Sequence, residues 1–166
     1  MSLTMMRIDP LASIIPDYIT VEQKLLARVR EVCLPFCSRC AVTCCAEQYC
    51  RESLESPFLM RLVNLQELTY DHVNGWLGDR GCRLEFGRPM VCYEFFCQRF
   101  LTDDVFMSSD IRELIKAFIN IGGRARGTHH LICVLDPAAV SPSKIIKIRD
   151  RIRTLNNRLM GLPGKN

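Results

Sequence analysis

The sequence predicts a mainly α-helical fold, a small helical domain whose irregular cysteine-rich loops are organised around a metal centre. Three observations lead to this prediction. The chain has 166 residues, of which 48% are hydrophobic, so one domain of this size can bury an ordinary apolar core. In several segments apolar residues recur at spacings of three and four, as on one face of a helix. The chain also has 10 cysteines, well above ordinary usage.

We expect a single domain over residues 1–166, because no internal repeat, low-complexity tract or linker interrupts the sequence. Within it, residues 33–97 contain most of the cysteines and are predicted to form a metal-binding core. Residues 109–160 are predicted to form a helical C-terminal part.

The first helix is predicted over residues 20–33. Thr20 is suited to cap it, and Val21, Leu25 and Val29 recur at helical spacing. Pro35 is expected to end or restart this helix, because proline lacks the backbone N–H that a helix interior needs.

A second helix is predicted over residues 57–77, where leucines alternate with polar residues as far as Gly78. Residues 82–89 are expected to form a turn-rich connection. Pro89 is expected to open a short third helix, because proline is tolerated at the first helical position.

The C-terminal part begins with a predicted helix over residues 109–121, which Gly122 and Gly123 terminate. Residues 131–135 are apolar and fit either a strand or a helical turn. Residues 141–159 give the clearest helical pattern. Its apolar residues on one face are Ile145, Ile148, Ile152, Leu155 and Leu159.

The first 23 residues do not resemble a secretory signal, because Asp9, Pro10, Pro16 and Asp17 interrupt them. No apolar run approaches the roughly 18 residues that a membrane span requires. We therefore expect a cytoplasmic protein without a membrane contact. Thiols stay reduced in that compartment, so a cysteine cluster there indicates metal binding or catalysis rather than disulfides.

The cysteines fall into two groups separated by about thirty residues. Cys37 and Cys40 form a CxxC pair, a spacing at which a turn directs two sulfurs to one ion, and the doublet Cys44 and Cys45 follows. An alternative is core packing, since Cys33, Cys37, Cys40 and Cys44 would share one face of an uninterrupted helix. Disulfides are a second alternative. Cys133 lies in an apolar run and is interpreted as a core residue, while the role of Cys33 is left open.

Two motifs resemble the YkgJ-type cysteine-cluster family, a family described as zinc- or iron-chelating. They are CxxCxxxCC from Cys37 to Cys45 and a second stretch in which Cys82 precedes Arg88-Pro89-x-x-Cys92 and Phe95. The first motif has one extra residue before the doublet. The resemblance covers about residues 36–97. The resemblance implies that six of these cysteines are metal ligands. By their positions in the sequence, Cys50 and Cys97 are the best candidates for two further ligands, which makes eight. The predicted set is Cys37, Cys40, Cys44, Cys45, Cys50, Cys82, Cys92 and Cys97.

Thiolate ligands suit zinc as well as an iron-sulfur cluster. Eight ligands would supply two four-thiolate sites or one bridged centre. The irregular spacing and the doublet slightly favour an iron-sulfur cluster, and zinc stays the alternative. Cys92 would lie in the first turn of the helix after Pro89, where the helix dipole favours a thiolate. Four nearby arginines are candidates to offset the thiolate charge, namely Arg80, Arg83, Arg88 and Arg99.

Other candidate sites are weaker. His72 is interpreted as a surface residue, and His129 and His130 form a pair that carries little information about metal binding. The glycine- and arginine-rich segment 122–127 lacks the lysine and threonine of a phosphate-binding P-loop. It is interpreted as a loop that ends a helix.

The net charge of +4 is unevenly distributed. Residues 141–166 contain seven lysines and arginines and a single acidic residue, Asp150, and so carry +6. This suggests an alternative function, a metal-stapled nucleic-acid module, although few aromatic residues accompany the basic ones. The default interpretation is a solvated face on a helix that packs in the core or forms a homodimer.

We therefore expect a protein that holds zinc or an iron-sulfur cluster on about eight cysteine thiolates, in a structural or electron-transfer role. A cluster-dependent enzyme is a further alternative. The sequence identifies no catalytic residue, substrate or protein partner.

Overall fold

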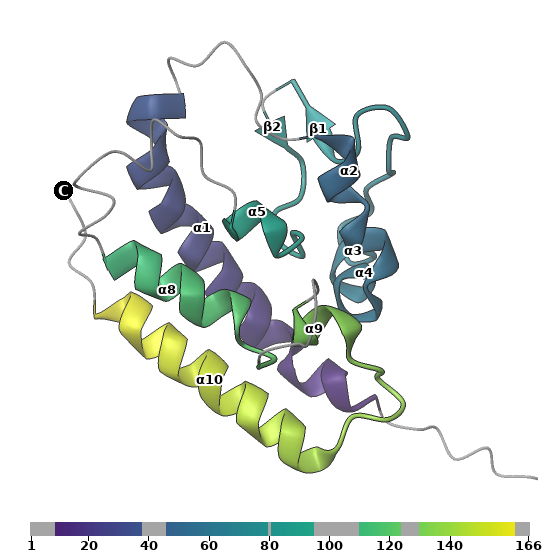
Figure 1. Cartoon of the computed structure of the whole chain (residues 1–166), viewed down its shortest axis with the longest axis vertical. Coiled ribbons are helices and arrows are strands. Elements are labelled where there is room, and N and C mark those ends of the chain that lie inside the picture. Colours follow the sequence, from purple (N-terminus) through teal and green to yellow (C-terminus); the bar gives the residue numbers. More distant parts are fainter. Residues whose placement is uncertain (1–8, 38–45, 80, 95–109, 124–129, 162–166) are drawn as a thin grey trace, which may run out of the picture.

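The computed structural model describes residues 9–37, 46–79, 81–94, 110–123 and 130–161, with only the backbone for residues 35–37. The architecture is mainly helical, as predicted. Figure 1 shows the three longest described helices side by side: α1 (Ile15–Cys37), α8 (Asp110–Ile119) and α10 (Pro142–Met160). Shorter elements gather on the other side of α1, among them α2 (Glu47–Cys50), α3 (Glu52–Glu55) and α4 (Pro57–Val63).

The first helix begins earlier than predicted. A 3-10 turn, η1 (Pro10–Ile14), precedes α1, and the Asp9 carboxylate accepts a hydrogen bond from the Leu11 N–H at 3.0 Å. The prediction that Thr20 caps the helix is wrong, because its hydroxyl donates to the Pro16 carbonyl at 3.0 Å inside the first turns. Asp9 and Pro10 supply the cap and the first position of the helical segment instead.

The same helix continues past Pro35 and ends at Cys37. The prediction that Pro35 ends or restarts it is therefore wrong. Proline removes one N–H from the helical ladder. Because only two residues follow, that loss is confined to the last turn.

The predicted helix over residues 57–77 is much shorter in the structure, where α4 ends at Val63. A turn replaces its second half. The Asp71 carboxylate accepts hydrogen bonds from the backbone N–H groups of Val73 and Asn74, at 2.7 and 2.9 Å. Such local side-chain acceptors compete with the helical ladder, which is why the leucine spacing alone was misleading here.

A two-stranded hairpin follows this turn, with β1 (Leu77–Gly78) antiparallel to β2 (Gly81–Cys82). The sequence did not predict it. The short helix expected after Pro89 is present as α5 (Val91–Glu94), and the Cys92 N–H donates to the Pro89 carbonyl at 3.0 Å.

The two long helices predicted near the C-terminus are confirmed. Helices α8 and α10 lie where the apolar spacing placed them, and Ser141 caps α10 by accepting from the Lys144 N–H at 3.3 Å. Residues 131–134 form the short helix α9 (Leu131–Val134), so the strand alternative is wrong. The main apolar core draws buried residues from α1, α4, α8, α9 and α10.

The apolar face of α10 packs inside the chain, since all five residues predicted to share it are buried. The exposed large apolar residues on this helix are Ile146 and Met160. A homodimer through α10 stays a prediction, as does the division into residues 33–97 and 109–160. Across the described ranges, no helix is both long enough and apolar enough to span a bilayer.

The turn that follows α8 makes a close backbone contact with α9. A Cβ added at Gly122 would lie 2.4 Å from the Ile132 nitrogen. Only glycine therefore fits at this position without moving the backbone of α9.

We expect Gly122→Ala to lower the free energy of unfolding by about 1–3 kcal/mol, because the added methyl overpacks this contact. Urea unfolding followed by circular dichroism measures the change. Gly161→Ala is the matched control, since its Cβ would meet nothing closer than 3.6 Å. The control should change the free energy of unfolding by less than about 0.5 kcal/mol. Equal effects of the two substitutions would contradict this account.

Candidate metal centre

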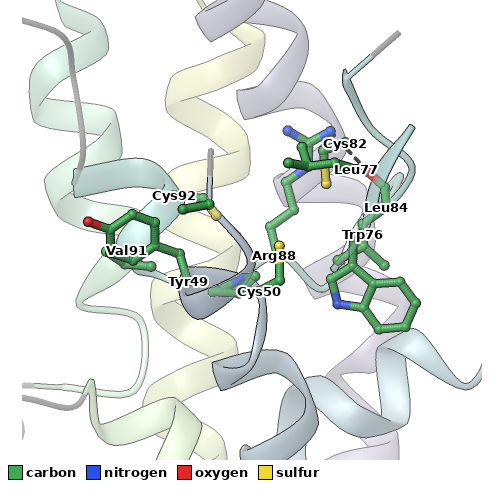
Figure 2. Close-up of a pocket in the computed structure, with 11 residues that line it drawn as sticks. Tyr49, Cys50, Trp76, Leu77, Cys82, Leu84, Arg88, Val91 and Cys92 are labelled. Atoms are coloured by element: carbon green, nitrogen blue, oxygen red, sulfur yellow. Dashed lines mark hydrogen bonds between the residues drawn. The ribbon is translucent and has the colours of Figure 1, made fainter. Parts of the chain in front are cut away.

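One cavity of about 130 Å³ is lined by three of the predicted ligands, Cys50, Cys82 and Cys92. They come from α2, β2 and α5, so the fold brings together cysteines from three separate elements. Figure 2 shows their sulfur atoms turned toward the same space, with Arg88 between them. Most of the exposed wall of the cavity is apolar. The other lining residues include Tyr49, Trp76, Leu77, Leu84, Pro89 and Val91.

Cys50 is held against the turn that precedes β1. A Cβ added at Gly75 would lie 2.8 Å from both the Cβ and the Sγ of Cys50, and Gly75 has a φ of +63°. Both facts require glycine there. Because Gly75 lies this close to Cys50, the backbone N–H of the next residue, Trp76, can hydrogen bond to the Cys50 thiol. Burial raises the pKa of this thiol, the Trp76 N–H lowers it, and the nearby Cys82 raises it.

A buried hydrogen-bond chain fixes α2 to the same turn. The Trp76 indole N–H donates to the Ser53 hydroxyl at 2.6 Å, and that hydroxyl donates to the Cys50 carbonyl at 2.7 Å. These groups have essentially no exposure, so each bond replaces a contact with water that folding removes. Cys50 and Trp76 belong to a second apolar cluster, with Val63 and Leu84.

Cys82 pairs with Leu77 across the hairpin and packs partly buried against the second apolar cluster. The Arg83 N–H donates to the Trp76 carbonyl at 2.8 Å, which continues the pairing beyond the strands. The Arg83 guanidinium turns to the Thr69 carbonyl, at 2.9 Å. Arg83 therefore braces the turn rather than lining the cavity.

Arg88 does line the cavity. Two of its guanidinium nitrogens, Nε and Nη2, donate to the Leu84 carbonyl at 3.1 and 2.9 Å. Figure 2 shows the Arg88 side chain among the residues that line the cavity, with its guanidinium bonded to the Leu84 carbonyl. A guanidinium held this way supplies a fixed positive charge next to the thiols, and it can offset thiolate charge. Arg80 and Arg99, the other two predicted arginines, lie outside the described residues.

The segment that carries Arg88 and Cys92 is anchored to α1 by a buried carboxylate. Glu22 has no exposed surface and accepts three hydrogen bonds. Its donors are the Gly87 N–H at 2.7 Å, the Arg88 N–H at 2.9 Å and the Tyr93 hydroxyl at 2.6 Å. Because both carboxylate oxygens are used, the carboxylate fixes the direction of the chain on both sides of Pro89.

Sequence reasoning missed this anchor. A signal was present, since Glu22 lies beside Val21 and one turn before Leu25 and Leu26, at a position that faces the core. An acidic residue on the apolar face of a helix is rarely buried without partners, so its position alone indicates a buried network.

The remaining predicted ligands lie where the structure gives no side-chain geometry. Cys37 ends α1, with only its backbone described. Cys40, Cys44, Cys45 and Cys97 lie outside the described residues. Among the side chains that are described, no three from cysteine, histidine, aspartate and glutamate lie close enough together to hold a metal ion. The predicted set of eight therefore stays a prediction.

The other cysteines and histidines take different surroundings. Cys133 is buried in the main core, which confirms its interpretation as a core residue, and burial raises the pKa of its thiol well above the ordinary value. Cys33 packs partly buried against the same core. His72 is exposed, as expected. His130 Nε2 lies 2.9 Å from Glu94 Oε1, and His129 lies outside the described residues.

Comparison with known proteins adds no relative. No protein-family model matches the chain, and neither a curated protein nor a solved structure matches it. The resemblance to the YkgJ-type family therefore stays an expectation from two motifs.

We expect Glu22→Gln to lower the free energy of unfolding by about 1–3 kcal/mol, because the amide NH₂ group cannot accept a hydrogen bond and leaves a buried donor unpaired. Urea unfolding at neutral pH measures this. The control is Glu31→Gln on the same helix, where the carboxylate is half exposed and pairs with Arg28. That change should stay below about 0.5 kcal/mol. A loss of the same size in both variants would contradict the anchoring role of Glu22.

The contribution of Glu22 to stability should also depend on pH. Burial, the largest cause, raises the pKa of Glu22 above its ordinary 4.5, although the bonds from Tyr93, Gly87 and Arg88 lower it. The folded chain thus binds more protons at this site than the unfolded chain. The stability advantage of wild type over Glu22→Gln should be largest below pH 4.5 and decrease as the pH rises through the raised pKa. Urea unfolding of both proteins across this range measures it, and an advantage that grows with pH would contradict the prediction.

Proposed function

We propose that this protein binds zinc or an iron-sulfur cluster through cysteine thiolates, with Cys50, Cys82 and Cys92 among the ligands. The observation that carries the proposal is that these three residues, from three separate elements, line one cavity. The other predicted ligands would complete the coordination. They are Cys37, Cys40, Cys44, Cys45 and Cys97.

The chemistry of the cavity fits a thiolate-bound metal. Its exposed surface is mainly apolar, and such surroundings disfavour a bare thiolate, as the raised pKa of the Cys50 thiol indicates. A bound metal ion changes this balance, because it deprotonates a coordinating thiol outright. Metal binding at Cys50 would therefore be coupled to the release of its thiol proton.

Groups around the sulfurs are of the kind that supports thiolate ligands. The Trp76 backbone N–H hydrogen bonds to the Cys50 sulfur, and Arg88 lines the same cavity as the three cysteines. Hydrogen bonds and charge compensation outside the ligands orient them and adjust the properties of the metal. An iron-sulfur cluster would supply electron transfer when bound, and zinc would supply a structural cross-link between the segments.

A thiolate site here would cross-link α2, β2 and α5, which lie beside the second apolar cluster. Among the described residues, this cluster contains four buried members, Cys50, Val63, Trp76 and Leu84. A metal shared by α2, β2 and α5 would add its binding free energy to the stability of this region. A structural role thus agrees with the small size of the cluster, and it is compatible with a second role in electron transfer.

Elemental analysis with a visible spectrum, on protein purified without oxygen, tests the proposal. Iron with acid-labile sulfide and broad absorbance near roughly 400 nm would identify a cluster. Zinc without colour would identify a structural thiolate site. Neither metal, with reactive thiols and an intact fold, would refute the proposal.

We expect Cys50→Ala, Cys82→Ala and Cys92→Ala each to weaken metal retention by more than about 10-fold, because each removes a thiolate ligand. Competition with a chelator, followed by metal analysis, measures retention. Cys133→Ala is the matched control, since it removes a buried thiol from the main core and should leave retention unchanged. Loss of metal from the control to the same extent would mean that a general loss of stability, rather than coordination, explains the results.

A further inference from the structure

Two cations, Lys144 and Arg151, approach the backbone where α8 ends, and the charge of Lys147 acts on Lys144. Lys144 and Lys147 lie in the first two turns of α10, and Arg151 follows on the same helix. A Cβ added at Gly123 would lie 3.1 Å from Lys144 Nζ and 3.2 Å from Arg151 Nη1, so both groups approach the same backbone position. Gly123 has a φ of +96°, a conformation that glycine adopts readily.

Capping of α8 accounts for only part of this arrangement. Arg151 Nη1 donates to the Ile121 carbonyl at 3.0 Å, a favourable contact near a helix C-terminus. The dipole at that terminus corresponds to about half a negative elementary charge. One guanidinium is enough to compensate it. The ammonium groups of Lys144 and Lys147 therefore bring more positive charge than the partial negative charge at the end of α8 can compensate.

Within the part of the chain that the structure describes, these cations form no ion pair. The ammonium groups of both lysines are also without a hydrogen bond there. Partial burial lowers the pKa of Lys144, and the charges of Arg151 and Lys147 lower it further. The neighbouring acid on the helix, Asp150, lines a groove between α8 and α10 together with Arg151 and Arg158, and no ion pair joins it to these cations among the described residues. Like charges at this separation repel, so the cluster raises the free energy of the fold unless an anion binds.

The geometry points to a binding site for a phosphate group, held by Lys144, Lys147 and Arg151 beside Gly123. Ammonium groups act as mobile point charges, and the guanidinium offers planar donors, a combination that suits phosphate oxygens. Glycine leaves the backbone open to the anion, because no Cβ occupies the space between the two cationic nitrogens. This site lies outside the thiol cavity, and the inference does not depend on the metal.

Titration of the full-length, as-purified protein with inorganic phosphate, followed by the amide NMR signals of Gly122, Gly123 and Lys144, tests the inference. We expect saturable shifts at these amides. Lys144→Gln should weaken phosphate binding about fivefold or more, because it removes one direct cation. Thermal unfolding by circular dichroism establishes that the variant is folded, and Lys147→Gln provides a second variant of the same kind.

Arg153→Gln is the matched control, since it removes one positive charge from the same helix at an exposed position about 200° around from Arg151. It should weaken binding less than twofold, as expected for a screened, distant charge. No saturable shift, or equal weakening by Lys144→Gln and Arg153→Gln, would overturn the inference, because the latter result reports only the general charge of α10.

A short single-stranded oligonucleotide distinguishes the sources of the phosphate. If it shifts the same amides and loses affinity mainly in Lys144→Gln, the site accepts a backbone phosphate of nucleic acid. If it loses affinity equally in Lys144→Gln and Arg153→Gln while inorganic phosphate stays sensitive to Lys144 alone, the site is one for a small phosphate compound. Either outcome supports the phosphate site.

Discussion

The carboxylate of Glu22 is the constraint on which the arrangement around the thiol cavity depends. A carboxylate without exposed surface must find donors inside the protein, since the cost of burying it unpaired exceeds the whole stability margin of many domains. Glu22 finds them in one short segment, at Gly87, Arg88 and Tyr93. The three bonds join α1 to the stretch that carries Arg88 and Cys92. The position of this stretch, and with it one wall of the cavity, follows from a single buried acceptor.

A second constraint comes from backbone groups that approach more closely than a side chain allows. Gly75 lets the Trp76 amide reach the Cys50 sulfur, and Gly87 lies where an added Cβ would meet the Leu62 side chain at 2.8 Å. Both glycines have positive φ. The cavity is therefore bounded by turns rather than by long helices. Turns can present N–H groups to sulfur because those groups are not used in a helical ladder.

The two proposed sites have opposite electrostatics. Around the thiol cavity, an arginine and a backbone N–H face groups that become anionic when a metal binds. At the end of α8, Lys144 and Arg151 face backbone, with the charge of Lys147 acting on Lys144, and none of the three has an ion-pair partner among the described residues. The excess of positive charge in residues 141–166 is thus partly explained by this group of cations. The cations on α10 do not all point into solvent, and part of their charge is concentrated beside one glycine.

Apolar periodicity by itself determined the helices of the C-terminal part, because residues such as Ile145, Ile148 and Ile152 must share a buried face whatever they pack against. It also determined that Cys133 is a core residue, and the density of cysteines raised the hypothesis of a thiolate metal site. Only the tertiary structure decided that Cys50, Cys82 and Cys92 line one cavity, that α4 stops at Val63 and that Glu22 is buried. Each of these depends on contacts between residues distant in sequence or on the hydrogen bonds of a turn. Spacing along the chain does not record such contacts, since it reports which face a residue shares and not what that face meets.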